Sequence, residues 1–144
     1  MSVIYLSGPI ANGHTASPRE MYKNVRNGED LMYKLMKKGW SVICPHLSYH
    51  AWINWPDDIP WERWLQQDYD FVSKADAFFY MDPKIYGKSK GAEREHEWAK
   101  AWNKPIYYTI DDVPSIKHPI TKAKIESGDI MEQPMEKLSL LDVS

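Results

Sequence analysis

Two acidic residues stand where the pattern of the chain calls for an apolar side chain. Glu95 shares a helix face with Ala92 and Ala99, because steps of three and four residues return to the same side of a helix. Asp68 interrupts the apolar face of an earlier stretch, residues 61–75, in the same way. A carboxylate that faces an apolar interior costs several kcal/mol unless it is paired or hydrogen-bonded. Each acid is therefore either a structural group, satisfied by a backbone amide or a tyrosine, or part of a site.

Paired carboxylates have a chemistry of their own, the cleavage of a glycosidic bond. One acid attacks the anomeric carbon and the other moves the proton, with the two carboxyl groups about 5 Å apart in the retaining geometry. Different surroundings can separate the two pKa values, which gives each acid a distinct role. Two such acids on consecutive helical stretches therefore favour a glycosidic reaction over two unrelated structural groups.

The turn before Glu95 has the composition of an anion site. Residues 87–92, Gly-Lys-Ser-Lys-Gly-Ala, lead into the helix with small side chains, one hydroxyl group and free backbone amides. The Gly-Lys-Ser sequence does not form a Walker motif, because the upstream glycine is missing at the required spacing. A simple capped helix start is the other interpretation of this turn.

Four strands and three helices are expected to position these groups. Short apolar runs that end in turns predict the strands, and apolar positions at helical spacing predict the helices. The first helix begins with a capping box, Ser17 to Glu20, and stops at Gly39. Residues 46–60 are expected to form a long loop. The predicted strands are 3–6, 40–44, 77–81 and 105–110, and the predicted helices are 18–38, 61–75 and 91–102.

Strands that alternate with helices imply βαβ units and a parallel sheet. Ligands bind such sheets at the carboxyl ends of the strands. That edge would bring together Ser7 and Gly8, the segment that starts at His46, and the segment 81–91. These segments are therefore expected to surround one crevice.

The composition excludes several other classes of protein. A chain of 144 residues with 43% hydrophobic and 26% charged residues can form one globular domain with a core. A net charge of −2 argues against a surface for nucleic-acid polymers, and no run is long and apolar enough to span a membrane. The first ten residues lack the basic segment of a signal peptide. The single cysteine, Cys44, is expected to be a buried strand residue and fits a reducing, cytoplasmic location.

No organic cofactor is implied by the sequence, and no metal site is expected. His46 and His50 are four residues apart, but they fall in the stretch expected to be a loop, where that spacing does not bring two ligands to one face.

Several motifs resemble the nucleoside 2-deoxyribosyltransferase superfamily, and among its members the (2′-deoxy)nucleoside 5′-monophosphate N-glycosidases most. The similarity covers about residues 3–110, and the order of the motifs is fairly specific. The resemblance implies a flavodoxin-like, three-layer α/β sandwich with a mostly parallel sheet of four to five strands. The motifs are Tyr5-Leu-Ser-Gly-Pro9, Asp68, Ala75-Asp-Ala77 and Ser89-Lys-Gly-Ala-Glu-Arg-Glu95.

The resemblance also implies roles for particular residues. Glu95 would form a covalent glycosyl intermediate, Asp68 would assist the movement of the proton, and Tyr5 would lie near the nucleophile. Ser89 falls on a position that is aspartate in the nucleoside transferases and serine in the monophosphate hydrolases. A serine can donate to a phosphate that an aspartate would repel, so a 5′-monophosphate is the expected substrate.

The remaining residues expected to bind substrate surround these groups. Tyr86 is either a base-stacking residue or a surface tyrosine. The hydrolases place an arginine shortly after the first-strand turn, where this chain has Ala11-Asn-Gly-His14, so His14, Arg19 or Lys88 would have to take its place. The expected substrate-binding residues are Ser7, Gly8, Pro9, Asn12, His14, Ser89, Gly91, Ala92 and Tyr86.

The sequence thus predicts an enzyme, an N-glycosidase or a nucleoside deoxyribosyltransferase. It would cleave a (deoxy)nucleoside 5′-monophosphate through a glycosyl-Glu95 intermediate, by hydrolysis or by base exchange. Two alternatives are a TIR-like NAD glycohydrolase and a nucleotide-binding or sequestering protein without turnover. The base, and the choice between ribose and 2′-deoxyribose, stay open.

Tryptophan content bears on domain organisation and assembly. Residues 1–112 form the expected catalytic domain, and residues 113–144 form a C-terminal extension that could act as an arm between subunits. Four tryptophans on two helices exceed what one small sheet face readily covers, which predicts a homodimer or a dimer-based oligomer. The other interpretation is that they fill the core and the base pocket of a monomer. They are Trp61, Trp64, Trp98 and Trp102.

Overall fold

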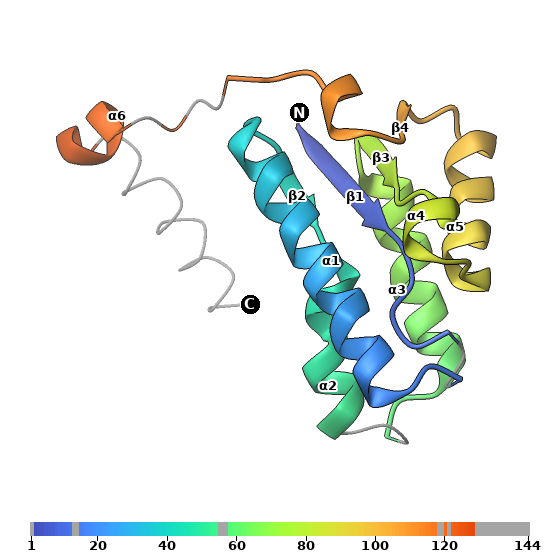
Figure 1. Ribbon diagram of the computed structural model, residues 1–144. Coiled ribbons are helices and arrows are strands. Elements are labelled where there is room, and N and C mark those ends of the chain that lie inside the picture. The colour runs from blue at the N-terminus through green and yellow to red at the C-terminus, as the bar shows by residue number, and fades with distance from the viewer. Residues whose placement is uncertain (1, 13–14, 55–57, 118–119, 121, 129–144) are drawn as a thin grey trace, which may run out of the picture.

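Four parallel strands form one sheet in the computed structural model, which describes residues 2–12, 15–54, 58–117, 120 and 122–128 (Figure 1). The strand order is β2-β1-β3-β4, which matches the first four positions of the flavodoxin-like order. The predicted α/β class and parallel sheet are confirmed. The strands are β1 (Val3–Ser7), β2 (Ser41–Ile43), β3 (Ala77–Tyr80) and β4 (Ile106–Tyr107).

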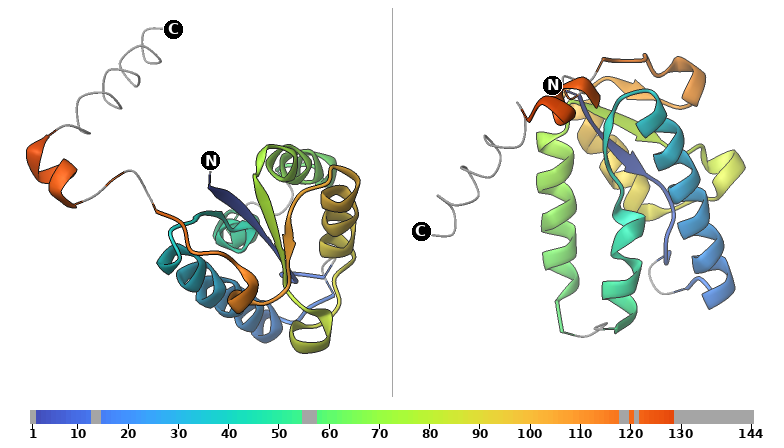
Figure 2. Two further views of the ribbon diagram at one scale, coloured as in Figure 1. Left: turned by 90° about the horizontal axis from the view of Figure 1, so that it is seen from above. Right: turned by 90° about the vertical axis from the view of Figure 1, so that its left-hand side faces the viewer.

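Helices cover both faces of this sheet, so the molecule has three layers (Figure 2). One face is covered by α1 (Pro18–Lys37), and the other is covered by α3 (Trp61–Lys74) and α5 (Lys90–Ala101). Short helices complete the described part of the chain: α2 (Tyr49–Asn54), α4 (Pro83–Tyr86), α6 (Lys122–Ser127) and the 3₁₀ turns η1 (Pro45–Ser48) and η2 (Ile110–Asp112).

The central strand β1 sends alternate side chains into the two layers, because successive residues of a strand point to opposite faces. Ile4 and Leu6 pack in the core beneath α1. Tyr5 packs in the second core, beneath α3 and α5, and Ser7 is on the same side of the strand. The strand that builds both cores therefore also presents two hydroxyl groups toward α5.

The first long helix begins and ends as its sequence predicts. Ser17 caps α1 by accepting a hydrogen bond from the Glu20 amide at 3.1 Å, and Pro18 occupies the first helical position. Gly39 follows the helix with a φ of +97°, a left-handed conformation that glycine adopts at little cost. A side chain at Gly39 would also collide with the backbone of Ile116.

The prediction of a long loop over residues 46–60 is wrong for its first half. Residues 45–48 form η1 and residues 49–54 form α2. Helices of six residues or fewer complete less than two turns, so their sequences show no full period of apolar positions. The same reason explains why α4 and α6 were not predicted. The last strand, β4, is shorter than expected and has two residues.

The segment after η2 crosses back over the start of β2. Val113 is buried in the core beneath α1. The Trp40 indole donates to the Pro114 carbonyl at 2.8 Å, and the Ile116 amide donates to the Lys38 carbonyl at 2.8 Å. Beyond this crossing, α6 stands away from the sheet (Figures 1 and 2).

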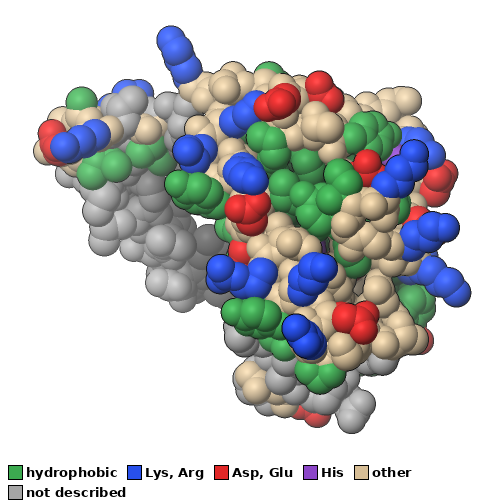
Figure 3. All heavy atoms as spheres, in the orientation of Figure 1, with side chains coloured by type: hydrophobic (Ala, Val, Ile, Leu, Met, Phe, Trp, Pro, Cys, Tyr) green, Lys and Arg blue, Asp and Glu red, His purple; other side chains and the backbone are tan. Residues whose placement is uncertain are grey.

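Charges of both signs are interspersed on the face of the molecule that carries α1 (Figure 3). Two ion pairs lie along this helix, Lys34 with Asp30 at 2.9 Å and Arg26 with Glu29 at 3.8 Å. Within the described residues, no helix combines the length and the apolar character that a membrane crossing requires.

Candidate active site

Glu95 is buried at the centre of a polar cluster. Only 8% of its surface is exposed. The Tyr5 hydroxyl donates to Glu95 Oε2 at 2.9 Å, and the Ser7 hydroxyl donates to Oε1 at 2.6 Å. Both carboxyl oxygens are therefore hydrogen-bonded, although the donors lie about 90 residues away along the chain. The helix-face argument from the sequence is confirmed, since Ala92 and Ala99 are buried on the same side of α5.

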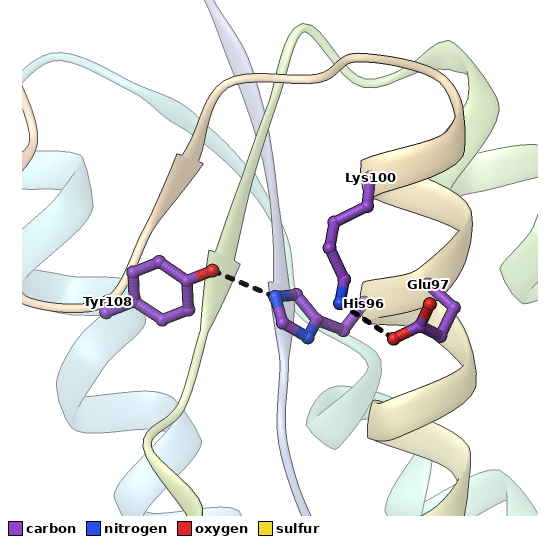
Figure 4. Close-up of polar contacts among 4 residues, drawn as sticks. All are labelled: His96, Glu97, Lys100 and Tyr108. Atoms are coloured by element: carbon purple, nitrogen blue, oxygen red, sulfur yellow. Dashed lines mark hydrogen bonds and ion pairs between the residues drawn. The ribbon is translucent and has the colours of Figure 1, made fainter.

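Two further hydrogen bonds hold the part of α5 that carries Glu95, one at the start of the helix and one at the residue after Glu95. Ser89 caps the helix by accepting from the Ala92 amide at 3.2 Å. His96, the next residue after Glu95, forms a hydrogen bond with the Tyr108 hydroxyl at 3.0 Å and so ties the helix to the end of β4 (Figure 4). Consecutive helix positions point about 100° apart, so with His96 held at the sheet edge Glu95 faces the central strand.

Asp68 of α3 is the second acid of the cluster. Burial raises the pKa of Asp68 to about 6, although hydrogen bonds with Glu95 and Tyr5 lower it. Burial, followed by the charge of Asp68, raises the pKa of Glu95 to about 8. A hydrogen bond between two acids requires that one of them is protonated, so the pair shares one proton.

Tyr5 acts as a hydrogen-bond donor in this cluster. Burial, then the charges of Glu95 and Asp68, raise the pKa of the Tyr5 phenol well above its usual value. The phenol therefore keeps its proton. The cluster has two neutral donors and two acids that hold one proton between them near neutral pH.

A pocket of about 850 Å³ opens over the two acids at the carboxyl ends of the strands. Its volume is in the range of sites for small organic molecules. Three parts of the chain form its walls: the loop after β1, the segment from η1 to α3, and the start of α5. Lining residues from these parts are Gly8, Ile10, Ala11, Asn12, Thr15, Pro45, Ser48, Tyr49, Trp61, Trp64, Asp68, Lys88, Ser89, Lys90, Gly91, Ala92, Glu93, Arg94 and Glu95.

Cationic and aromatic groups stand at the mouth of this pocket. Lys88 and Lys90 flank Ser89 at the start of α5. The Arg94 guanidinium lies over the ring of Trp61 at 5.5 Å from the ring centre. Trp61 is 58% exposed, so most of its surface faces solvent at the entrance. The pocket thus carries cationic and aromatic groups together, with Arg94 of α5 in contact with Trp61 of α3.

The loop after β1 packs tightly on the core residues beneath it. A side chain at Gly8 would collide with Met81, so only glycine lets the loop approach β3 here. His46 is buried beneath the loop. Burial lowers the pKa of His46 to about 4, and a hydrogen bond with the backbone of Pro9 opposes part of this shift. The Asn24 amide donates to the Ile10 carbonyl at 2.8 Å.

The structure brings together most of the residues expected in the site. Tyr5 and Ser7 lie beneath the pocket on Glu95, and Pro9 is buried beside His46. Tyr86 is not among the lining residues, because it packs against the core beneath α1. His14 lies outside the described residues. Those that line the pocket are Gly8, Asn12, Asp68, Ser89, Gly91, Ala92 and Glu95.

Several lining residues were assigned another role in the sequence, or none. Trp61 and Trp64 were expected at a subunit interface, and the structure places them in the pocket wall. Lys88 lines the pocket, whereas Arg19, the other described candidate for the phosphate, is exposed outside it. The spacing of lysines around Ser89 was the available signal for a basic wall. No sequence signal could have placed Tyr49, because its helix was not predicted.

No group of three or more histidine, cysteine or acidic side chains with the arrangement of a metal site occurs among residues that the structure describes. Cys44 is a free, buried thiol whose pKa burial raises to about 11. Its expected burial is confirmed, but it follows β2 and does not lie within the strand.

Comparisons with known proteins place the chain among relatives. The family model described as "Domain of unknown function (DUF7768)" matches residues 2–109. Comparison with curated proteins gives no match. Among solved structures, the chain is similar to "Structure of Clostridium botulinum CMP N-glycosidase, BcmB", with 22% sequence identity and a TM-score of 0.44, over 96% of this chain and 99% of that chain.

Proposed function

We propose a function for this chain, which belongs to the DUF7768 family of domains of unknown function: it cleaves the N-glycosidic bond of a nucleoside 5′-monophosphate. The observation that carries this proposal is the pair of acids, the buried Glu95 and the half-buried Asp68, which share a proton in the wall of a pocket. Glycosidic cleavage needs one ionised and one protonated carboxyl group at the same time. A pair with one proton meets that requirement.

Glu95 is the nucleophile in this mechanism. In the reactive form of the pair the shared proton is on Asp68 and Glu95 is ionised. Glu95 then attacks C1′ of the sugar as the bond from C1′ to the base nitrogen breaks, and Asp68 gives its proton to the departing base. The donors Tyr5 and Ser7 stabilise the Glu95 carboxylate while the sugar carries positive charge.

Water completes the reaction in the hydrolytic form of this mechanism. Asp68, now ionised, takes a proton from a water molecule that attacks C1′, and the ester bond to Glu95 breaks. The products are the free base and a sugar 5-phosphate. A second base in place of water would give base exchange, and the same two acids would serve both outcomes.

The start of α5 is proposed to bind the phosphate group. Ser89 and the backbone at Gly91 lie at a helix N-terminus, where the helix dipole and free amides favour an anion. Lys88 and Lys90 add positive charge on the same wall. These lysines replace the arginine that the resembling hydrolases carry after the first strand, where this chain has Ala11.

The aromatic residues of the pocket are proposed to bind the base. Tyr49, Trp61 and Trp64 line the pocket on the side of α3, the helix that carries Asp68. An aromatic face stacks on any of the nucleobases, so this wall gives affinity without choosing among them. It also places the leaving base next to the acid that protonates it.

We further propose that the protein is a homodimer or a dimer-based oligomer in the cytoplasm. Tyr69 of α3 packs edge-to-face on Trp98 and Trp102 of α5, with ring centres 5.1 and 4.9 Å apart. In this aromatic patch Trp98 and Trp102 are partly buried against the core beneath α3 and α5, and Tyr69 is 45% exposed. A second copy that packs on it would remove the exposed rings from water. The residues after Ile116 are proposed as an arm toward that copy.

A substrate panel tests the proposed reaction. Purified protein is incubated with ribo- and 2′-deoxyribonucleoside 5′-monophosphates, the matching nucleosides and NAD, and the free base is followed by chromatography. Release of base from a monophosphate that fails with Glu95→Gln supports the proposal. Release of nicotinamide alone would instead identify an NAD glycohydrolase, and binding without release from any compound would identify a binding protein.

A further inference from the structure

An asparagine in the pocket wall has a side-chain carbonyl group without a partner. Asn12 follows β1 by five residues and lines the pocket together with Glu95 and Asp68. Its Oδ1 is buried and has no hydrogen-bond partner among the described residues. A buried acceptor in this state costs free energy that the rest of the fold must offset. Such a group is suited to accept a hydrogen bond from a ligand.

The backbone of the loop holds Asn12 in an uncommon conformation. Its φ is +48°, in the left-handed region that few residues other than glycine and asparagine adopt. The Thr15 hydroxyl donates to the Asn12 carbonyl at 2.6 Å, and the Thr15 amide donates to the same oxygen at 3.2 Å. With the backbone fixed, the carboxamide retains its soft terminal torsion, which lets Oδ1 turn toward the pocket.

Each part of a nucleotide is assigned to a different part of the pocket. The phosphate is assigned to the basic start of α5, and the base is assigned to the aromatic residues Tyr49, Trp61 and Trp64. The sugar lies between them, because Glu95 must reach C1′. The loop after β1, which contains Asn12, also lines the pocket, and the sugar hydroxyl groups are assigned to it.

We propose that Asn12 accepts a hydrogen bond from the 2′-hydroxyl group of the substrate and makes the enzyme select ribonucleotides over 2′-deoxyribonucleotides. C2′ is bonded to C1′, the atom that Glu95 attacks, so its hydroxyl is the sugar hydroxyl nearest the nucleophile. A hydrogen bond to that hydroxyl also strengthens as the sugar gains positive charge in the transition state. This inference rests on the proposed function and names the sugar that the site takes.

Three variants isolate the side-chain acceptor from the backbone of the loop. Asn12→Gly removes the carboxamide while glycine accepts the left-handed backbone. Asn12→Asp keeps an acceptor and also tolerates that conformation. Asn103→Gly is the matched control, because Asn103 is likewise left-handed, with a φ of +55°, but is not among the pocket-lining residues.

The readout is the ratio of kcat/KM for a ribonucleotide and its 2′-deoxy analogue with the same base. Wild type and Asn103→Gly are expected to favour the ribonucleotide by about tenfold, the usual contribution of one such hydrogen bond. Asn12→Gly should lower this ratio to near one, and Asn12→Asp should retain most of it. A 3′-deoxy analogue and a pair of bases with and without an exocyclic amine are run in parallel.

The proposal is overturned if Asn12→Gly leaves the ribose preference unchanged. It is also overturned if that variant changes the response only to the 3′-deoxy analogue or to the exocyclic amine, since Asn12 would then bind another group. Titration calorimetry with ribose 5-phosphate and 2-deoxyribose 5-phosphate separates this inference from the proposed reaction. A ribose preference that is lost in Asn12→Gly supports the inference even if no base is released.

Discussion

Glu95 is a buried carboxyl group that costs the fold free energy and is the proposed nucleophile. Burial raises the pKa of the Glu95 carboxyl group, yet its oxygens are hydrogen-bonded by three neighbours, Tyr5, Ser7 and Asp68. An acid whose pKa is raised by folding stabilises the folded state less and less as the pH increases. The free energy lost by keeping an ionisable group here is explained if the group is the nucleophile.

Replacing Glu95 by glutamine should abolish base release and stabilise the protein. Glutamine keeps one oxygen that accepts from Tyr5 or Ser7, and its amide group can donate to the other hydroxyl or to Asp68, but it cannot attack C1′. The wild-type contribution is fully present below about pH 4.5 and is lost as the pH rises to about 8, so the gain in melting temperature should grow over that range. Thermal unfolding at pH 5 and pH 8.5 measures it. Glu93→Gln is the control on the same helix, and base release by Glu95→Gln at the wild-type rate would refute the nucleophile assignment.

The wild-type rate should show a bell-shaped dependence on pH. Below about pH 6 both acids are protonated, so no nucleophile is available, and above about pH 8 both are ionised, so no proton is available for the base. The rate constant kcat/KM, measured from pH 5 to pH 9, should therefore be highest between these limits. A rate that keeps rising through pH 9 would contradict a shared proton.

Asp68→Asn should slow base release by about 10²–10⁴-fold, the usual effect of losing a positioned acid. Asparagine has the shape of aspartate and removes the proton chemistry alone. Substrates with a better leaving base should lose less, because their departure needs less protonation. Steady-state rates on a poor and a good leaving base measure this difference. An equal rate in wild type and variant would make Asp68 a structural acid.

Residue-scale prediction from the sequence succeeded where periodicity decides and failed where distant segments meet. The three- and four-residue steps were enough to turn Glu95 inward. The hydrogen bond from Ser7 to Glu95 joins positions 88 residues apart, and local patterns carry no information on such a contact. The sequence left open whether Trp61 lies at an interface or in the base pocket, since an amphipathic helix shows which face is apolar but not what that face meets.

At the scale of elements, the residue that caps α5 is also the residue proposed to bind the phosphate of the substrate. Ser89 is the N-cap of this helix and lies between two lysines at the pocket wall. Ser17 holds the same position on α1, outside the pocket. The chain therefore contains two serine caps that differ mainly in what lies beside them.

Ser89→Asp should reverse the preference for a 5′-monophosphate over the matching nucleoside. Aspartate caps a helix as well as serine does, so α5 should remain intact, but its charge repels a phosphate. The ratio of kcat/KM for the two substrates measures the change. Ser17→Asp should leave that ratio as in wild type. A wild-type enzyme with equal constants for both substrates would remove the basis for a phosphate site here.

Sequence patterns predicted the long elements of this fold and missed the short ones. The helices α1, α3 and α5 have enough turns for apolar periodicity to show. The parallel strands follow from their alternation with these helices. The helix α2 has six residues, and its place in the pocket wall depends on the preceding turn η1 and its packing on α1, which the sequence does not reveal.

At the scale of the whole molecule, the proposed dimer can be tested by measuring the mass of the protein in solution. Light scattering at micromolar concentration should give a dimeric mass, or an even multiple of the monomer. Tyr69→Lys should shift the protein toward the monomer, because it places a charge in the aromatic patch. Tyr22→Lys on α1, where the tyrosine is 61% exposed, is the matched control and should not. A fully active wild-type monomer would contradict the assembly.

The side chains of β1 alternate between the two cores, and this has a consequence for how the family can diversify. Tyr5 and Ser7 belong to the strand that holds the sheet together, so a mutation there risks folding as well as turnover. Trp61, Lys88 and Lys90 stand at the rim, where substitutions disturb little of the interior. Under the proposed function, descendants of one ancestral gene can therefore change their substrate by single steps at the entrance, whereas changes at Tyr5 and Ser7 must also preserve the fold.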